Sequence, residues 1–257
     1  MGSLLERVRQ INQLVQHSAD LTGDYSPMAE RLAELIGGNI YLIESDGNLQ
    51  GQALRDEPDC PQVVPGDEAR LSPAFHQQLA FLLTPAVNIK LEDCFFHESG
   101  CNPASRTMTI IPIQSGGERL GTLLLTRREG QYTEDDLILA EVGATVLGMA
   151  FLRHRLERSQ ADARHKANVQ IALDSLSFSE MEAITNVFDE LGGTEGFLVA
   201  SKIADRIGIT RSVIVNAMRK LESAGVVESR SLGMKGTYIR VQNRFFLDEL
   251  AKRGRPK

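Results

Sequence analysis

The chain has 257 residues, with 34 Asp or Glu against 28 Lys or Arg, which gives a formal net charge of −6. This length is enough for about two domains with hydrophobic cores. The acidic balance argues against a protein that coats nucleic acid indiscriminately, and no apolar run approaches the roughly 20 residues of a membrane span. Three cysteines, an odd number, argue against a disulfide framework and fit the reducing cytoplasm.

The N-terminal segment predicts two helices. The first is amphipathic, carries charges throughout and is not the pattern of a signal peptide. The residues expected on its buried face are Leu4, Leu5, Val8, Ile11 and Val15. The second helix is expected to have Ser26 as its N-cap and Pro27 at its first position, and to end at Gly37 and Gly38.

An antiparallel sheet is predicted after these helices. Two hairpins are expected, one around Asp46-Gly47 and one around the Gly-Gly pair at 116–117. Their strands are expected at 39–44, 48–53, 107–113 and 119–126, with a helix at about 72–83 and loops elsewhere between the hairpins. Helices packed on such a sheet are typical of an α+β sensory domain.

Two capping boxes mark the helices that follow. Thr133 and Asp136 are spaced to begin a long helical stretch that reaches about Leu176 without a strong breaker. Ser177 and Glu180 are spaced to begin the next helix in the same way. The charged part of the long stretch, 151–176, is expected to be a linker helix between two domains.

The stretch 201–241 carries the clearest functional pattern. A short helix stops at Gly208, Thr210 stands at an N-cap position, and a second helix continues to about Ser223, which is the helix-turn-helix pattern. Two β-prone runs, 226–231 and 237–241, follow as a hairpin, or wing. Residues 197–241 contain eight Lys or Arg and three Asp or Glu, so this segment is +5 within an acidic chain. Such a basic island indicates contact with a phosphate backbone.

Polar and basic residues of this stretch are the DNA-binding candidates. Those expected to reach bases are Arg211, Ser212, Asn216 and Arg219, because Arg and Asn match guanine and adenine edges. Those expected to reach phosphates are Ser201, Lys202, Arg230, Ser231 and Lys235, with Lys220 as a weaker candidate. One reader helix covers part of a groove, so a homodimer on an inverted repeat is expected. The alternative is a surface helix pair with ordinary solvated charges.

The domains expected from the whole chain are a sensor over 1–150, the linker helix over 151–176, a winged helix-turn-helix over 177–250 and a basic tail over 251–257. The tail contains Lys252-Arg253-Gly254-Arg255-Pro256-Lys257, which resembles an AT-hook core. The alternative for this short motif is a disordered basic tail.

A family resemblance covers both domains. The run VASKIADRIGITRSVIVNAMRKLESAGVVESRSLGMKGTYIRV closely resembles the winged helix-turn-helix of the CodY family. GGERLGTLLL, DDLILAEVGATVLGM and LLERVRQINQLVQ are similar to the family as well, whereas 54–106 shows little likeness. The resemblance implies an N-terminal GAF-type domain, a long linker helix and a dimeric repressor of metabolic genes at AT-rich operators. It implies branched-chain amino acids and GTP as effectors.

The effector segments depart from the family pattern. The family's nucleotide-contacting hairpin resembles Ser-Arg-Arg-Gly-Lys, whereas residues 44–48 are Glu-Ser-Asp-Gly-Asn, and Ala150 replaces a linker carboxylate. Acidic groups repel a triphosphate, so a GTP response is not expected. The family's carboxylate-binding Arg falls near Pro61. Arg70 could replace it, and Leu71 and Phe75 either line an apolar effector cavity or belong to the plain core.

All three cysteines lie in the divergent segments. Cys94, His97 and Cys101 form a Cys-x2-His-x3-Cys pattern, and Cys60 is a fourth candidate ligand. Three thiolates and an imidazole suit zinc, and thiolates also suit an iron–sulfur cluster. The alternative is incidental cysteines and a surface histidine.

The sequence predicts a ligand-responsive transcriptional regulator and not an enzyme. A zinc-dependent enzyme is one alternative, but a Cys3His set fills all four zinc positions and leaves none for water. An architectural DNA-binding protein is another, which the acidic sensor domain disfavours.

Overall fold

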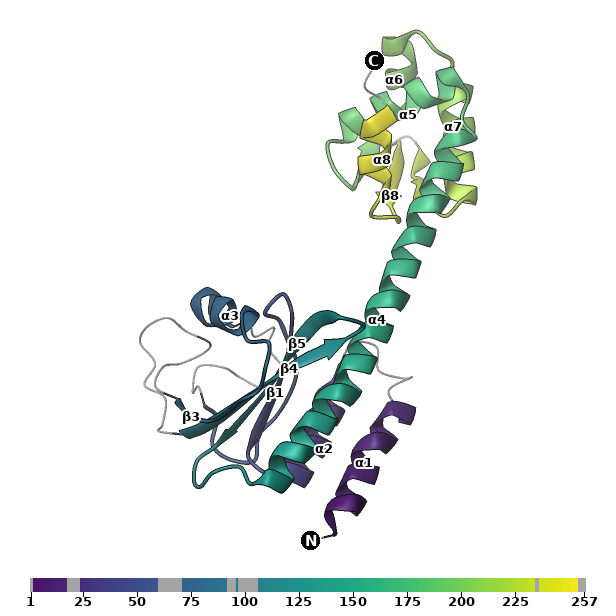
Figure 1. The fold of residues 1–257 in the computed structure, drawn as a ribbon. Helices are drawn as coiled ribbons and strands as arrows, with labels where there is room; N and C mark the ends of the chain where they lie inside the picture. The colour runs from purple at the N-terminus through teal and green to yellow at the C-terminus, as the bar shows by residue number, and fades with distance from the viewer. Residues whose placement is uncertain are drawn as a thin grey trace. The chain divides into compact units, whose positions relative to one another are not determined.

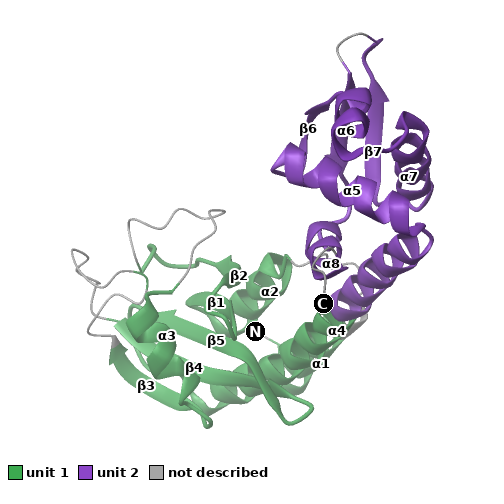
Figure 2. Ribbon diagram, turned by 90° about the horizontal axis from the view of Figure 1, so that it is seen from above, with its two compact units in different colours: residues 1–156 green, residues 157–257 purple. Residues whose placement is uncertain are grey.

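The computed structural model describes residues 2–17, 24–59, 71–91, 96, 106–233 and 236–253. The chain divides into two compact units, residues 1–156 and 157–257 (Figures 1 and 2). Helix α4, Glu134–Asp174, contributes residues to both units. Within the described residues, no helix is both long and apolar enough to cross a membrane.

The first unit is built on a five-stranded antiparallel sheet in the order β2-β1-β5-β4-β3. Its strands are β1 Asn39–Glu44, β2 Leu49–Ala53, β3 Ala86–Leu91, β4 Arg106–Ser115 and β5 Glu118–Arg127. Both predicted hairpins are present. Gly47 turns the first with φ +86°, a conformation that favours glycine.

Each face of this sheet carries its own core. Helices α1 (Leu4–His17), α2 (Ser26–Ile36) and the first part of α4 cover one face, and α3 (Pro73–Ala80) covers the other (Figure 1). Successive residues of a strand point to opposite faces. In β1, therefore, Leu42 packs with the α2 and α4 core, while Tyr41 and Ile43 pack with the core beneath α3.

Several local predictions for this unit are wrong. Leu5 is 59% exposed, because residues two apart on a helix lie on nearly opposite faces and Arg7 is the one that faces inward. Arg7 Nη2 donates to Asp135 Oδ2 at 2.9 Å. Helix α2 has Tyr25 as its N-cap, and Ser26 lies inside the first turn with its N–H bonded to Asp24. The side chain of Val15 lies outside the described residues.

Strand β3 lies where a loop was predicted. Its pairing with β4 is irregular between Ala86 and Ile89, and Asn88 in between has φ +54°. That irregularity interrupts the alternation of polar and apolar residues by which a strand is recognised in a sequence. Helix α3 ends at Ala80, about one turn earlier than predicted, and Ser72 is its N-cap.

The second unit packs helices on a three-stranded antiparallel sheet in the order β6-β8-β7. Its strands are β6 Glu195–Leu198, β7 Val227–Ser231 and β8 Thr237–Val241. Its helices are α5 Phe178–Leu191, α6 Ala200–Ile207, α7 Arg211–Ser223 and α8 Phe246–Arg253, together with the end of α4. The predicted wing is β7 and β8.

Helix α8 includes the first residues of the predicted tail. Lys252 and Arg253 are helical and form ion pairs with Glu249 and Asp174, respectively. The helix forms because Phe246 and Leu250 are buried one turn apart. Arg253 is therefore not part of an extended AT-hook core, and residues 254–257 lie outside the described chain.

Both predicted capping boxes are present. Thr133 N donates to Asp136 Oδ2 at 3.0 Å, and Asp136 N donates to Thr133 Oγ1 at 3.3 Å. At the start of α5, Ser177 N donates to Glu180 Oε2 at 2.8 Å, and Glu180 N donates to Ser177 Oγ at 3.3 Å. Each box satisfies amide groups that the helix itself leaves without acceptors.

Ser177→Ala should therefore lower the free energy of unfolding by about 1 kcal/mol, the usual cost of losing a serine N-cap. Urea unfolding followed by circular dichroism would measure it. Ser159→Ala, at an exposed position within α4, is the matched control and should cost no more than about 0.5 kcal/mol. Equal stability of the two variants would contradict a stabilising role for this cap.

Candidate nucleic-acid interface and effector site

The helix-turn-helix is formed by α6 and α7. Gly208 ends α6 in the left-handed conformation, φ +73°, and its N–H donates to Ala204 O. Thr210 has the extended backbone of an N-cap, but its Oγ1 lies 2.8 Å from Ser212 Oγ and forms no capping bond. The apolar residues Ile214, Met218 and Leu221, spaced four and three apart along α7, are buried and form one stripe of the helix.

The opposite face of α7 is exposed. Arg211, Ser212, Asn216 and Arg219 all lie on it. Among the described residues, no side chain is hydrogen-bonded to the side chain of Arg211, Asn216 or Arg219. Their donor groups are therefore open to a ligand, as base-reading side chains require.

The phosphate-contacting candidates differ in their surroundings. Ser201 and Lys202 are exposed on α6, and Ser231 is exposed at the end of β7. Arg230 is exposed too, but its Nη2 donates to Glu228 Oε1 at 2.8 Å. Lys235 lies outside the described residues.

Lys220 is engaged within the second unit. Its Nζ donates to Glu180 Oε2 at 2.7 Å and to Ser175 O at 2.9 Å. Two hydrogen bonds lower the pKa of the Glu180 carboxyl: the larger effect comes from the Lys220 ammonium and the next from the backbone N–H of Ser177. This ammonium therefore links α7 to the start of α5, and a phosphate would have to compete with Glu180 for it.

The α3 face of the first unit's sheet holds the described effector candidates. Leu71 is buried, and Phe75 packs partly buried against the same core as Tyr41 and Phe96. The rings of Tyr41 and Phe96 meet edge to face, with centroids 5.8 Å apart. Arg70 lies outside the described residues. The structure thus brings Leu71 and Phe75 together, in a setting that fits both a plain core and one wall of a cavity.

The two carboxylates of the hairpin at 44–48, Glu44 and Asp46, each accept hydrogen bonds from a nearby amide side chain. Gln50 Nε2 donates to Glu44 Oε2 at 2.9 Å, and Asn48 donates through both nitrogens to the carboxylate of Asp46. Ser45 O lies 3.0 Å from His76 Nε2. Neither carboxylate in this turn favours a triphosphate.

The four candidate metal ligands, Cys60, Cys94, His97 and Cys101, lie outside the described residues. In the part of the chain that is described, no three His, Cys, Asp or Glu side chains are grouped to hold a metal ion. The predicted metal site stays a prediction.

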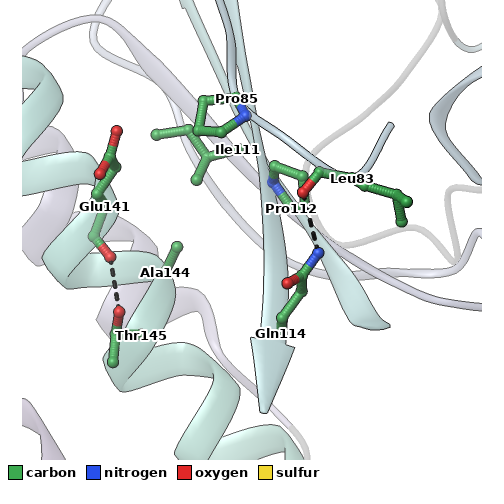
Figure 3. Close-up of a pocket in the computed structure, with 8 residues that line it drawn as sticks. All are labelled: Leu83, Pro85, Ile111, Pro112, Gln114, Glu141, Ala144 and Thr145. Carbon is green, nitrogen blue, oxygen red and sulfur yellow. Dashed lines mark hydrogen bonds between the residues drawn. The ribbon is translucent and has the colours of Figure 1, made fainter. Parts of the chain in front are cut away.

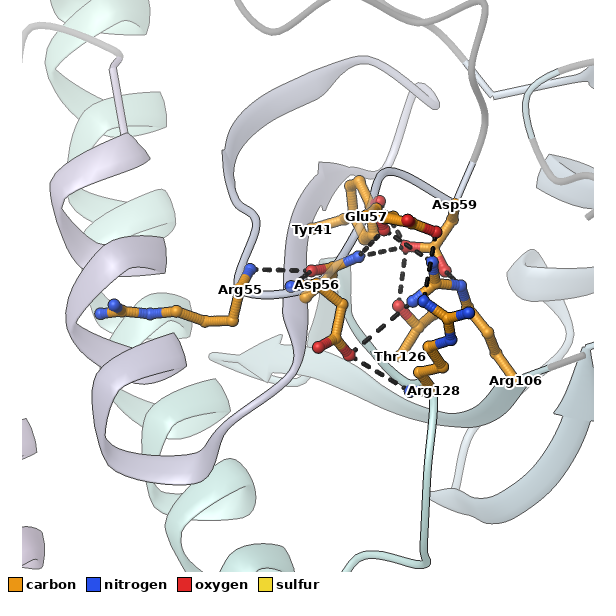
Figure 4. Close-up of polar contacts among 9 residues, drawn as sticks. Tyr41, Arg55, Asp56, Glu57, Asp59, Arg106, Thr126 and Arg128 are labelled. Carbon is orange, nitrogen blue, oxygen red and sulfur yellow. Dashed lines mark hydrogen bonds and ion pairs between the residues drawn. The ribbon is translucent and has the colours of Figure 1, made fainter. Parts of the chain in front are cut away.

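A buried polar network lies at one end of the α3 face (Figure 4). Asp59 Oδ2 accepts hydrogen bonds from Asn39 Nδ2 at 2.9 Å, Tyr41 OH at 2.5 Å and Thr126 Oγ1 at 2.7 Å. Arg106 Nε lies 2.9 Å from Asp59 Oδ1 in an ion pair whose side chains are 1% and 0% exposed. Burial, and then the charge of Asp59, raise the pKa of Tyr41 far above its ordinary value, so the phenol stays a donor.

The sequence did not point to this network. Residues 54–59 have the composition of a solvated loop, and the partners come from three different strands. The signal that could have found it is Arg106, a cation directly before the apolar strand run 107–113.

A groove of about 290 Å³ opens on the opposite, α4 side of the sheet (Figure 3). It is lined by Leu83, Pro85, Ile111, Pro112, Gln114, Glu141, Ala144 and Thr145. Gln114 Nε2 donates to Leu83 O at 3.1 Å, and Glu141 is the one ionisable side chain of this lining. The groove therefore lies away from Leu71 and Phe75.

Comparison with known proteins supports the prediction for both units. Residues 3–175 match the CodY GAF-like domain, and residues 194–253 match the CodY helix-turn-helix domain. The global transcriptional regulator CodY of Geobacillus kaustophilus (strain HTA426) is 50% identical over 254 residues, covering 97% of this chain and 98% of the relative. That of Lysinibacillus sphaericus (strain C3-41) is 48% identical with the same coverage.

Among solved structures, the chain is similar to the cofactor binding GAF domain of the nutrient sensor CodY from Clostridium difficile. The match has 28% identity and a TM-score of 0.42, and covers 58% of this chain and 97% of that one. The predicted α+β fold class, with its GAF-like domain, long helix and helix-turn-helix, is confirmed. The chain belongs to the CodY family: it is a transcriptional regulator, not an enzyme, with an effector-sensing GAF-like domain and a DNA-binding helix-turn-helix domain.

Proposed function

We propose that the chain acts in the cytoplasm as a homodimeric repressor of metabolic genes that binds an AT-rich inverted repeat. Its sensor is assigned to residues 1–150, its linker helix to 151–176, its DNA-binding domain to 177–250 and its basic tail to 251–257. The observation that carries this proposal is the face of α7, where Arg211, Asn216 and Arg219 are exposed above a buried stripe. An inverted repeat and a dimer give each half-site its own reader helix.

The effector is a branched-chain amino acid or a metal or redox signal. The apolar surroundings of Leu71 and Phe75 support the amino acid, with Arg70 as one candidate for its carboxylate. The spacing of Cys94, His97 and Cys101, with Cys60, supports zinc or an iron–sulfur cluster. Glu44 and Asp46 argue against GTP.

The test is operator binding by fluorescence anisotropy, with and without isoleucine, GTP and a metal chelator. We expect tight binding to the inverted repeat, weak binding to scrambled DNA and little change with GTP. A strong GTP enhancement would contradict the argument from residues 44–48. Equal affinity for repeat and scrambled DNA would refute the proposed function itself.

Lys202→Ala should weaken binding to all DNA sequences by a similar factor, because a phosphate contact carries no sequence information. The slope of log affinity against log salt concentration should become less negative by about 0.9, which is the contribution of one phosphate contact. Lys166→Ala removes the same charge from an exposed position in α4 and is the matched control. If both variants had the same slope, Lys202 would not be a phosphate contact.

A further inference from the structure

We propose that the outer face of the second unit's sheet is a docking surface for a second copy of this chain. The outer face is the side of the β6-β8-β7 sheet that points away from the helices. Its side chains are Glu195, Phe197, Glu228, Arg230, Tyr238 and Arg240. The inference goes beyond the proposed function, because it concerns contact between protein chains and depends on neither effector nor operator. It assigns Arg230 to a protein contact in place of a phosphate.

The strand register places these six side chains on one face. Residues that pair directly across antiparallel strands point to the same side of a sheet, and so do residues two apart along one strand. One row across the three strands is Arg230, Tyr238 and Phe197. The next row, two residues further along β8, is Glu228, Arg240 and Glu195.

The inner side of the same sheet is buried. Leu198, Val227 and Ile239 pack there in one core with the helices, which includes the buried stripe of α7. The exposed reading face of α7 and the outer face of the sheet therefore lie on different sides of this core. A chain that binds DNA through α7 keeps its outer face open to a protein.

Aromatic and arginine side chains dominate what the outer face exposes. Phe197 is 65% exposed, and its ring centroid lies 5.1 Å from that of Tyr238. The side chains of Arg230 and Arg240 are 73% and 60% exposed. Tyr, Phe and Arg are enriched at the centres of protein–protein interfaces. The composition of the outer face therefore favours a protein partner.

Hydrogen bonds hold the polar groups of the outer face in place. Arg230 donates to Glu228 Oε1 through Nε at 3.0 Å and through Nη2 at 2.8 Å. Gln242 Nε2 donates to Glu228 Oε2 at 2.8 Å, and Tyr238 OH donates to Glu195 Oε2 at 2.8 Å. Side chains that are already ordered lose little conformational entropy on binding, so this surface is preorganised for association.

The charges of the outer face select its partner. Two Arg and two Glu give it no net charge, so a polyanion such as DNA gains no net attraction from it. A two-fold axis that runs across the strands, between the two rows, would set each row against the other row of a second copy. Arg230 would then meet the partner's Glu228, and Arg240 would meet the ring of the partner's Tyr238. Because the axis makes each contact twice, the outer face is complementary to itself.

The outer face is small for a stable interface. Its six side chains compare with about 20 to 30 residues per partner in a standard interface, so association through it should be weak in free solution. Two copies held close together on DNA would meet at a much higher effective concentration. The contact therefore suits copies bound at neighbouring stretches of DNA.

The test is sedimentation equilibrium of the full chain over a series of protein concentrations, with the formation of species larger than the homodimer as the signal. Arg230→Glu leaves one Arg and three Glu on the outer face, and Glu228→Arg leaves three Arg and one Glu. Each variant alone should form these species at least about tenfold more weakly than the wild type, because like charges then face each other. An equal mixture of the two variants should associate at least as tightly as the wild type.

Arg206→Glu and Glu190→Arg are the matched controls. These two residues form an exposed ion pair between α6 and α5 of the same unit, with side chains 58% and 41% exposed. The controls change the net charge of the chain by the same amounts as the two test variants. Each control should associate like the wild type.

Two outcomes would overturn the proposal. One is association of Arg230→Glu and Glu228→Arg as tight as that of the wild type, which would leave the outer face to a different protein. The other is a mixture that associates no more tightly than either variant alone. Mixing cannot restore the Arg230–Glu228 pair within one chain, so a gain on mixing requires contact between chains. Since neither DNA nor effector is present, a failure of operator binding would refute the proposed function and leave this result unchanged.

Discussion

Arg219→Ala should lower affinity for the operator about ten- to hundredfold and leave affinity for scrambled DNA nearly unchanged. A bidentate arginine contact to a base edge is worth about 1 to 3 kcal/mol of discrimination against the wrong base. Arg219 lies on the exposed face of α7 with Ser212 and Asn216, and its guanidinium has no side-chain partner among the described residues. Competition binding of operator against scrambled duplexes measures the ratio directly.

Lys220→Ala is the matched control for this prediction. It removes the same charge from the next residue, but the ammonium of Lys220 is bound to Glu180 and Ser175 O. Its loss should lower the stability of the second unit and leave sequence preference unchanged. Equal losses on operator and scrambled DNA for Arg219→Ala would show that Arg219 binds phosphate and does not read bases.

The DNA-binding unit was predictable because its signals are local. Gly208 ends α6, Ser177 and Glu180 begin α5, and the stripe of Ile214, Met218 and Leu221 sets the buried face of α7. Each signal lies within a few residues and acts through backbone geometry or helical period. Strand β6 was missed because four residues are too few to show alternation.

The sensor was predictable only in part. The two hairpins have strong turn signals, but β3 has a bulge at Asn88 that hides its period. The polar network could not be found from spacing, because Asp59 meets Thr126 across 67 positions of the chain and its partners share no local motif. Such contacts arise from the packing of the whole sheet. Such long-range contacts therefore cannot be predicted from local sequence patterns.

Asp59→Ala should lower the free energy of unfolding of the first unit by about 3 to 5 kcal/mol, the cost of leaving one partner of a buried ion pair alone. Arg106 is 1% exposed at its side chain, so water cannot replace the lost carboxylate. Asn39, Tyr41 and Thr126 would also lose their common acceptor. Urea unfolding measures the change, and Glu57→Ala is the control, because its carboxylate is 73% exposed and its pair with Arg128 contributes little.

The neutral double variant Asp59→Asn/Arg106→Gln separates two explanations of this loss. If the loss of stability comes from leaving the Arg106 charge buried alone, the double variant should recover a large part of the lost free energy of unfolding, because it has no buried charge. If the double variant is as unstable as Asp59→Ala, the hydrogen bonds to Oδ2 hold the segment 54–59 and the charges are incidental.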